Sequence, residues 1–200
     1  MAARSLILAF LGPSASGKSS VVRELERRGV VTVTPSWTTR PRRGDEADGT
    51  IEHRFVTDGE FDELIDAGYF LEVVTLFGLP YRYGLPTVDP ALGRRASAIM
   101  VRAPLMPLVA RHFPEHVAYQ IEIPREQARR RLLAREVDAP TVDARLRGFD
   151  DETVLGRASA HRVFVNTSSI DNLVTSVQSA IEEDFAVDTR RDGSECPDLV

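Results

Sequence analysis

The 200-residue sequence predicts an α/β fold in which helices flank a parallel sheet of five strands. Apolar runs of strand length alternate with amphipathic helical segments along most of the chain, which is the pattern of successive strand–helix–strand units. A glycine-containing turn at residues 12–19 follows the first apolar run and leads into a helical segment. With 42% apolar and 28% charged residues, the composition suits one globular domain.

The chain opens as a strand, a helix and a second strand. Residues 6–11 form an apolar run that predicts a buried strand, and a helix begins near Lys18 and ends at Gly29. Glycine is frequent just after a helix because it adopts the left-handed backbone conformation without steric cost. Residues 30–34 are rich in apolar side chains and predict the second strand.

Residues 35–90 break this alternation and predict a small insert between core elements. Thr57 and Glu60 fit a capping box, in which each side chain bonds the backbone of the other residue at the start of a helix. Gly68 is placed to end that helix. The insert is expected to contain, in order, a charged loop at 36–49, a helix at 58–67, a strand at 72–77 and a loop rich in glycine, proline and tyrosine at 78–86.

After the insert the alternation resumes and completes the core. Pro104 stands in the expected first turn of a helix, a position that tolerates its missing N–H. The expected strands lie at 98–101, 117–123 and 163–165, and the expected helices at 104–112, 125–135, from about 141, and at 170–185. Residues 188–200 predict a disordered tail. One domain is therefore expected over residues 1–187, with its core in residues 1–34 and 96–187.

Charge and cysteine content narrow the classes of function. A net charge of −5 argues against general nucleic-acid binding. The one cysteine, Cys196, excludes an intramolecular disulfide and a cysteine-rich metal site. No apolar stretch approaches the length of a membrane span, and the N-terminus lacks the pattern of a signal peptide. We expect a cytoplasmic monomer or homodimer whose partners are small phosphorylated molecules, with neither nucleic acid nor membrane among them.

The turn at residues 12–19 (GPSASGKS) fits the phosphate-binding pattern G-x-x-x-x-G-K-[ST]. Backbone N–H groups of such a loop surround phosphate oxygens, and the positive end of the following helix adds to the field. Lys18 is expected to reach the β- and γ-phosphates of ATP, and the Ser19 hydroxyl to ligate Mg²⁺. The residues expected to bind ATP here are Ser14, Ala15, Ser16, Gly17, Lys18, Ser19 and Ser20.

Three further segments succeed the phosphate loop as they do in guanylate kinases. They are residues 36–46 (SWTTRPRRGDE), 55–56 (FV) and 70–72 (FLE). The sequence resembles that family over residues 5–185. The resemblance implies the P-loop NTPase fold of nucleoside monophosphate kinases and a helical lid at about 131–147. It also implies ATP as donor, Mg²⁺ as cofactor, and GMP or dGMP as acceptor.

By this resemblance, six residues of the insert bind the acceptor. The expected set is Ser36, Arg40, Arg43, Glu72, Tyr81 and Tyr83. Ser36, Arg40 and Arg43 would hold the acceptor's phosphate, since a guanidinium binds phosphate oxygens in pairs and stays charged. Glu72 would read the edge of a guanine. The alternative interpretations are a solvated basic loop for the arginines and an outward-facing strand residue for Glu72.

A second group of arginines predicts a lid over the donor phosphates. Arg131 and Arg135 stand four residues apart on one face of an expected helix, and Arg145 lies in the next helical stretch. Arginines over a γ-phosphate neutralise the charge that develops during its transfer. The resemblance gives these three residues that role and implies that Asn166 lies near the donor adenine. The alternative is a helix surface that is merely rich in arginine.

The expected reaction is in-line transfer of the γ-phosphoryl group of ATP to an acceptor oxygen. Positioning and charge stabilisation do the catalysis, and the residues expected to supply them are Lys18, Arg40, Arg131, Arg135 and Arg145. An acceptor phosphate is ionised at neutral pH and needs no strong general base, so no catalytic histidine or aspartate is expected.

Departures from the guanylate kinase pattern support a second hypothesis. Residues 98–104 (AIMVRAP) lack the acidic pair that the family carries after its middle strand. His53 and residues 78–86 resemble instead ribose 1,5-bisphosphate phosphokinases, whose acceptor is a sugar bisphosphate, and Arg82 and Arg102 would supply extra cations for it. A third hypothesis is a non-catalytic guanylate-kinase-like interaction domain. Such domains typically lose the phosphate-loop lysine, which this chain keeps.

Overall fold

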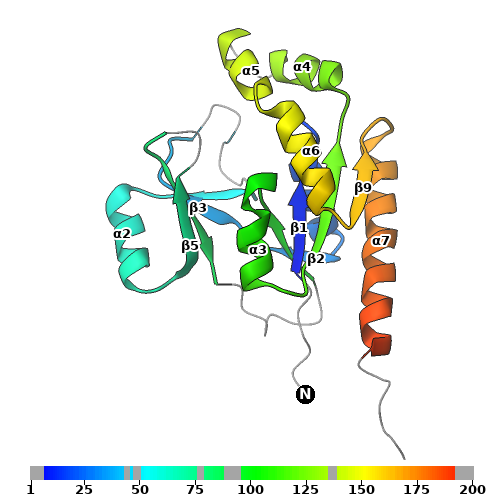
Figure 1. The fold of residues 1–200 in the computed structure, drawn as a ribbon, viewed down its shortest axis with the longest axis horizontal. Helices are drawn as coiled ribbons and strands as arrows, with labels where there is room; N and C mark the ends of the chain where they lie inside the picture. Colours follow the sequence, from blue (N-terminus) through cyan, green and yellow to red (C-terminus); the bar gives the residue numbers. More distant parts are fainter. Residues whose placement is uncertain are drawn as a thin grey trace, which may run out of the picture.

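In the computed structural model, five parallel strands form a central sheet with helices on both faces (Figure 1). The strands are β1 (Ile7–Leu11), β2 (Val31–Val33), β7 (Ala96–Met100), β8 (Val117–Glu122) and β9 (Arg162–Val165). Their order is β2-β7-β1-β8-β9, and each neighbouring pair runs parallel. The structure describes residues 7–42, 46, 51–75, 79–87, 96–134 and 139–191. The expected α/β fold is confirmed.

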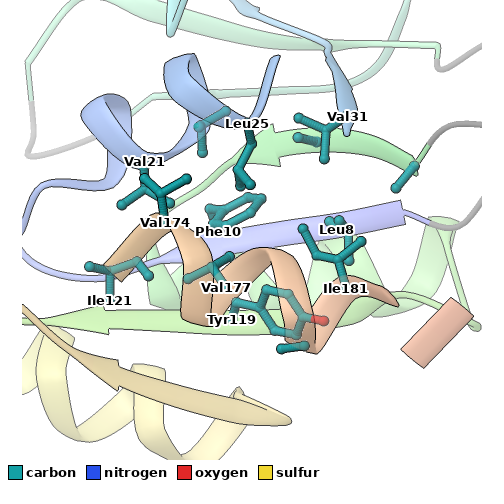
Figure 2. Close-up of a cluster of buried hydrophobic side chains, with 14 of the residues drawn as sticks. Leu8, Phe10, Val21, Leu25, Val31, Tyr119, Ile121, Val174, Val177 and Ile181 are labelled. Atoms are coloured by element: carbon teal, nitrogen blue, oxygen red, sulfur yellow. The ribbon is translucent and has the colours of Figure 1, made fainter. Parts of the chain in front are cut away.

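Side chains of β1 contribute to both halves of the core. Leu8 and Phe10 point to the face that is covered by α1 (Lys18–Arg27) and α7 (Ile170–Arg191). Figure 2 shows this cluster, in which the rings of Phe10 and Tyr119 pack edge to face with centroids 5.8 Å apart. Ile7 and Leu11 point to the other face, where α3 (Met106–His112) packs. Because successive strand residues face opposite ways, one apolar strand serves both layers.

Between β8 and β9 the chain forms three helices near the carboxyl edge of the sheet (Figure 1). They are α4 (Arg125–Leu133), α5 (Ala139–Leu146) and α6 (Phe149–Ser159). Leu132 of α4, Val142 of α5 and Phe149 of α6 share a buried cluster. α6 also packs on β8 and on the short 3-10 helix η1 (Ala103–Leu105). The sequence predicted one helix from about residue 141, but the structure has two helices, α5 and α6, and Gly148 lies between them.

The insert forms a mixed sheet of its own beside the core (Figure 1). Its strands are β3 (Ser36–Thr38), β4 (His53–Phe55), β5 (Phe70–Thr75) and β6 (Arg82–Pro86), in the order β4-β3-β6-β5. The expected capping box opens α2 (Asp58–Asp66): Thr57 N–H donates to the Glu60 carboxylate at 2.8 Å, and Glu60 N–H donates to the Thr57 hydroxyl at 3.2 Å. β3 and β6 fall in segments that were expected to be loops, so that expectation is wrong.

The end of the last helix also differs from the expectation. α7 continues to Arg191, beyond the expected end at 185, and so extends into the segment for which a tail was expected. Asp184 accepts a hydrogen bond from Arg162 Nη2 at 2.6 Å, and this contact attaches the later turns of α7 to β9. Residues 192–200 lie outside the described residues. Of the helices that the structure describes, none is both long and apolar enough to cross a membrane.

Candidate active site

The phosphate-binding pattern forms a tight loop between β1 and α1. Gly12 has φ +136°, and a Cβ atom there would overlap the carbonyl oxygen of Ile121 in β8. Gly17 has φ +101°, and its Cβ atom would lie 2.5 Å from Asn166 Nδ2. Residues with a side chain rarely adopt such φ values, and neither position has room for one. This backbone path therefore requires both glycines of the pattern.

Lys18 is the first residue of α1 and turns back over the loop. Its Nζ donates to the carbonyl oxygen of Gly12 and, at 3.3 Å, to that of Pro13. Burial lowers the pKa of Lys18, and the nearby Glu152 carboxylate opposes that shift. The ammonium group is therefore held by carbonyl oxygens, which are partners that phosphate oxygens can replace.

Two side chains from later elements brace the phosphate loop. Asn166, just after β9, is buried and donates from Nδ2 to the carbonyl oxygen of Ser16 at 2.8 Å. Arg131 on α4 donates from Nη1 to the carbonyl oxygen of Ala15 at 3.2 Å. Ala15 itself has φ +62°, which is uncommon for a residue with a Cβ atom. The fold thus places Arg131 beside the loop and Asn166 directly against it.

The other donor-side residues lie in the loop, in the first turn of α1 and on α5. Ser14 and Ser19 are half-buried, Ser20 is exposed, and Arg145 of α5 is half-buried. The buried hydroxyl of Ser16 has no hydrogen-bond partner among the described residues, which is unusual for a buried polar group. Arg135 lies outside the described residues.

Arg40 lies after β3 and is only 6% exposed. Its Nη1 donates to Glu46 Oε2 at 2.6 Å, its Nη2 bonds the other oxygen of that carboxylate, and its guanidinium carbon lies 4.9 Å from the centre of the Phe55 ring. Burial acts to lower the pKa of Arg40, but the Glu46 carboxylate outweighs it and raises the pKa. A guanidinium that directs two donors at one oxyanion has the geometry of phosphate binding. Arg43 lies outside the described residues.

Two residues of the expected acceptor site gather around His53 on β4. The Ser36 hydroxyl lies 2.7 Å from His53 Nδ1, and the His53 ring packs edge-on to Tyr83 with centroids 5.9 Å apart. Tyr83 belongs to β6, which pairs with β3, the strand that carries Ser36. Tyr81, just before β6, is half-buried. The insert sheet therefore brings Ser36 and Tyr83 to one histidine.

Glu72 on β5 pairs with two side chains of α3. Arg111 Nη2 donates to Glu72 Oε2, and His112 Nε2 lies 3.4 Å from the same oxygen. β5 and α3 lie side by side in this arrangement (Figure 1). The carboxylate that was expected to read a guanine is thus engaged by residues of the core.

The two arginines suggested for a sugar bisphosphate also have partners. Arg82 donates to Asp62 at 2.5 Å and to Asp58 at 2.8 Å, and these bonds attach β6 to α2. Arg102, just after β7, bonds both oxygens of Glu152 in α6, each at 3.2 Å. Sequence reasoning missed Glu152, because its partner is 50 positions away and no local pattern marks the pair.

The sheet order, the phosphate loop after β1 and the insert after β2 give the chain the fold of the P-loop nucleoside monophosphate kinases. No family model matches the chain. Over 180 residues the chain is 32% identical to the guanylate kinase of Mycobacterium sp. (strain MCS), covering 88% of this chain and 90% of that relative. The chain belongs to the guanylate kinase family.

Two further similarities cover different lengths. The guanylate kinase of Thermobifida fusca (strain YX) is 47% identical over 87 residues, which is 43% of this chain and 42% of that relative. The crystal structure of guanylate kinase from Anaplasma phagocytophilum matches with a TM-score of 0.66 at 23% identity, over 90% of this chain and 86% of that chain. This match to a solved structure shows similarity of the fold alone.

Proposed function

We propose that the protein transfers the γ-phosphoryl group of ATP to the phosphate of a small acceptor, and that this acceptor is GMP or dGMP. The observation that supports the proposal most is the phosphate loop, in which Lys18 and Arg131 both direct cationic groups at loop carbonyls. Membership of the guanylate kinase family supports a nucleoside monophosphate as the acceptor. We expect the reaction in the cytoplasm, by a monomer or homodimer without nucleic-acid or membrane partners.

On the donor side, Lys18 would exchange its carbonyl partners for oxygens of the β- and γ-phosphates. Backbone N–H groups of the loop and the N-terminal end of α1 would surround the remaining phosphate oxygens. Arg131 already donates a hydrogen bond to the carbonyl oxygen of Ala15 in the loop, and it would turn from there to the γ-phosphate. Together with Arg135 and Arg145 it would neutralise charge in the transition state.

Mg²⁺ fits this donor side. Ser19 presents a hydroxyl in the first turn of α1, next to Lys18, and a nucleotide-bound Mg²⁺ needs only one or two protein ligands besides phosphates and water. Bound there, the ion would supply charge neutralisation between the β- and γ-phosphates. Within the described ranges, no three histidine, cysteine, aspartate or glutamate side chains form a metal-binding group.

On the acceptor side, Arg40 would exchange the Glu46 carboxylate for the acceptor's phosphate. Its two donors already address the two oxygens of one anion. Ser36, Arg43, Tyr81 and Tyr83 would supply further contacts to that phosphate. Glu72 would read guanine once it is released from Arg111 and His112.

A sugar bisphosphate is the second candidate acceptor, and one observation favours it. Glu72 is engaged by Arg111 and His112 in place of a base, and Arg102 stands where the family carries acidic residues. An arginine in place of an acidic pair suits an acceptor with a second phosphate better than one with a neutral base. A non-catalytic interaction domain is disfavoured because the phosphate loop keeps Lys18 in place.

The test is ADP release from ATP and Mg²⁺ over GMP, dGMP, AMP, CMP, UMP, dTMP and ribose 1,5-bisphosphate. We expect turnover with GMP and dGMP, and a loss on the order of 10²–10³-fold for Lys18→Ala, because one of the cations that neutralise the charge on the transferred group is then missing. Turnover confined to the sugar bisphosphate would select the second candidate. An unchanged rate for Lys18→Ala would refute the phosphate-loop assignment, and failure to bind ATP would favour the interaction domain.

Glu72→Gln tests the base-reading role by itself. If Glu72 reads guanine, the neutral amide lowers kcat/KM for GMP by about 10-fold or more relative to AMP, because one hydrogen bond to the base is lost. Equal kcat/KM ratios in the variant and the parent would remove Glu72 from the acceptor site. Glu63→Gln, on the exposed face of α2, is the control for loss of one negative charge on the insert.

A further inference from the structure

Arg102 and Glu152 form a partly buried ion pair that the proposed transfer to GMP does not use. The Glu152 side chain is 8% exposed, and its two oxygens accept hydrogen bonds from Nε and Nη2 of Arg102, each at 3.2 Å. A carboxylate so far removed from water depends on its partner, because an unpaired buried charge is strongly unfavourable. The pair is therefore a fixed feature of the site.

The pair joins two parts of the fold. Arg102 follows β7, the strand that lies beside β1 and its phosphate loop. Glu152 lies in α6, which begins directly after the turn from α5, the helix that carries Arg145. A Cβ atom at Gly148 in this turn would lie 3.9 Å from Arg102 Nη2, so the guanidinium also lies against the turn. The pair thus attaches the base of the helical segment α4–α5 to the core.

Both charges also act on the phosphate loop. The electrostatic environment of Lys18 includes Glu152, which stabilises its ammonium form, and Arg102, which opposes it. Of the two, Glu152 has the larger effect on the pKa of Lys18. Loss of one of them leaves a net charge beside the place where the triphosphate is proposed to bind.

We propose that Glu152 is a positioning residue of the phosphoryl-transfer site and that it acts through Arg102. Glu152 holds the Arg102 guanidinium in one orientation at the end of β7, and the same contact fixes the base of α5 and α6 relative to the phosphate loop. This inference rests on the proposed phosphotransferase function. Without the carboxylate, both the guanidinium and the helices that carry the lid arginines lose a fixed position.

Glu152→Gln tests this by removing the charge while keeping the shape. We expect kcat to fall by about 10- to 100-fold, because misplaced groups weaken transition-state contacts. ATP affinity, measured by titration calorimetry, should change by less than about threefold or increase, because a negative charge near the phosphates is lost. Asp150→Asn is the matched control: it removes one charge from the same helix, where Asp150 is 74% exposed and pairs with Arg125. Its kcat should stay within about twofold of the parent.

Repeating Glu152→Gln in an Arg102→Met variant distinguishes a Glu152 that acts through Arg102 from a Glu152 that acts directly. If Glu152 acts through Arg102, Glu152→Gln has little further effect on kcat in that background. An equal loss in both backgrounds would show a direct role and overturn the inference, as would a lower Tm with unchanged kcat. Should Glu152→Gln fail to fold, Glu152→Asp enters the same cycle, since it keeps the charge but withdraws it from Arg102.

Limited proteolysis tests the attachment without any acceptor. Cleavage between α4 and α6 should be faster in Glu152→Gln than in Asp150→Asn, and equal rates would overturn the inference. If none of the acceptors is phosphorylated while this difference remains, the proposed function fails but the attachment of the helices by Glu152 stands.

Discussion

At the residue scale, the phosphate loop needs its two glycines for two reasons: neighbouring atoms leave no room for a side chain, and the backbone φ angles are positive. Gly12 lies against the carbonyl oxygen of Ile121, and Gly17 lies against Asn166. The sequence predicted the loop because its glycines stand at fixed spacing within eight residues. It did not predict the partners of Glu72, because Arg111 lies 39 positions further along the chain. Local patterns reveal backbone requirements, whereas side-chain pairing across the fold leaves no local signal.

Gly12→Ala should lower the free energy of unfolding by about 2–4 kcal/mol, since the added methyl group overlaps a backbone oxygen and φ is positive. Gly59→Ala is the control: a Cβ atom there meets nothing within 4 Å, and alanine in α2 is favoured by about 1 kcal/mol. Urea denaturation followed by circular dichroism measures both changes. Equal stabilities of Gly12→Ala and the parent would contradict this loop geometry.

At the scale of elements, the sequence predicted an element correctly where the residues that mark it lie close together in the chain. The helix α2 was predicted from Thr57 and Glu60, and its capping box is present. The strands β3 and β6 were missed because they have three and five residues and contain or adjoin proline and glycine. Gly84 in β6 leaves space for the Phe70 ring, which would lie 2.5 Å from a Cβ atom there. Pairing with distant strands, rather than local periodicity, makes these segments strands.

The edge strand β9 should be sensitive to acid through His161. Ala118 N–H of β8 donates to His161 Nδ1 at 3.0 Å, which requires that nitrogen to be unprotonated. Burial and the neighbouring His116 lower the pKa of His161 below its usual 6.5. The unfolded chain therefore takes up the proton at higher pH than the folded chain, and this contribution to stability, complete above pH 6.5, is lost as the pH falls below it.

His161→Gln removes this proton uptake. Between about pH 7.5 and pH 5.5, the free energy of unfolding from urea titrations should decrease more in the parent than in His161→Gln. The carboxylates contribute alike to both proteins, so the difference between the two decreases isolates His161. Identical decreases would show that the Ala118 contact does not depend on the protonation of His161.

At the scale of the whole molecule, the donor side is assembled from segments that are far apart in sequence. Asn166 bonds Ser16 across 150 positions, and Arg131 bonds Ala15 across 116 positions. The sequence predicted the parallel core because alternation of strands and helices extends over most of the chain. The contacts of Glu152 and Glu72 depend on how α6 and α3 pack, which periodicity does not specify.

Because the donor side joins several elements, ATP should stabilise the whole fold. With Mg²⁺ and ATP at about 100 times its Kd, the free energy of unfolding should increase by about 2.7 kcal/mol, since only the folded chain has the loop. Differential scanning fluorimetry should show a rise in Tm for the parent and little change for Lys18→Ala. An equal rise in both would indicate that ATP binds away from the phosphate loop.

The pair of Arg40 and Glu46 has a consequence for ligand choice. Glu46 stands six positions from Arg40 and bonds two of its nitrogens, so it is a tethered competitor for any anion that uses this guanidinium. Short tethers give effective concentrations on the order of millimolar, so an anion that contacts Arg40 alone has to compete with Glu46 at that concentration. A ligand that also contacts other residues of the insert has further binding energy with which to displace Glu46. The loop thereby favours ligands that make several contacts over anions that bind Arg40 alone.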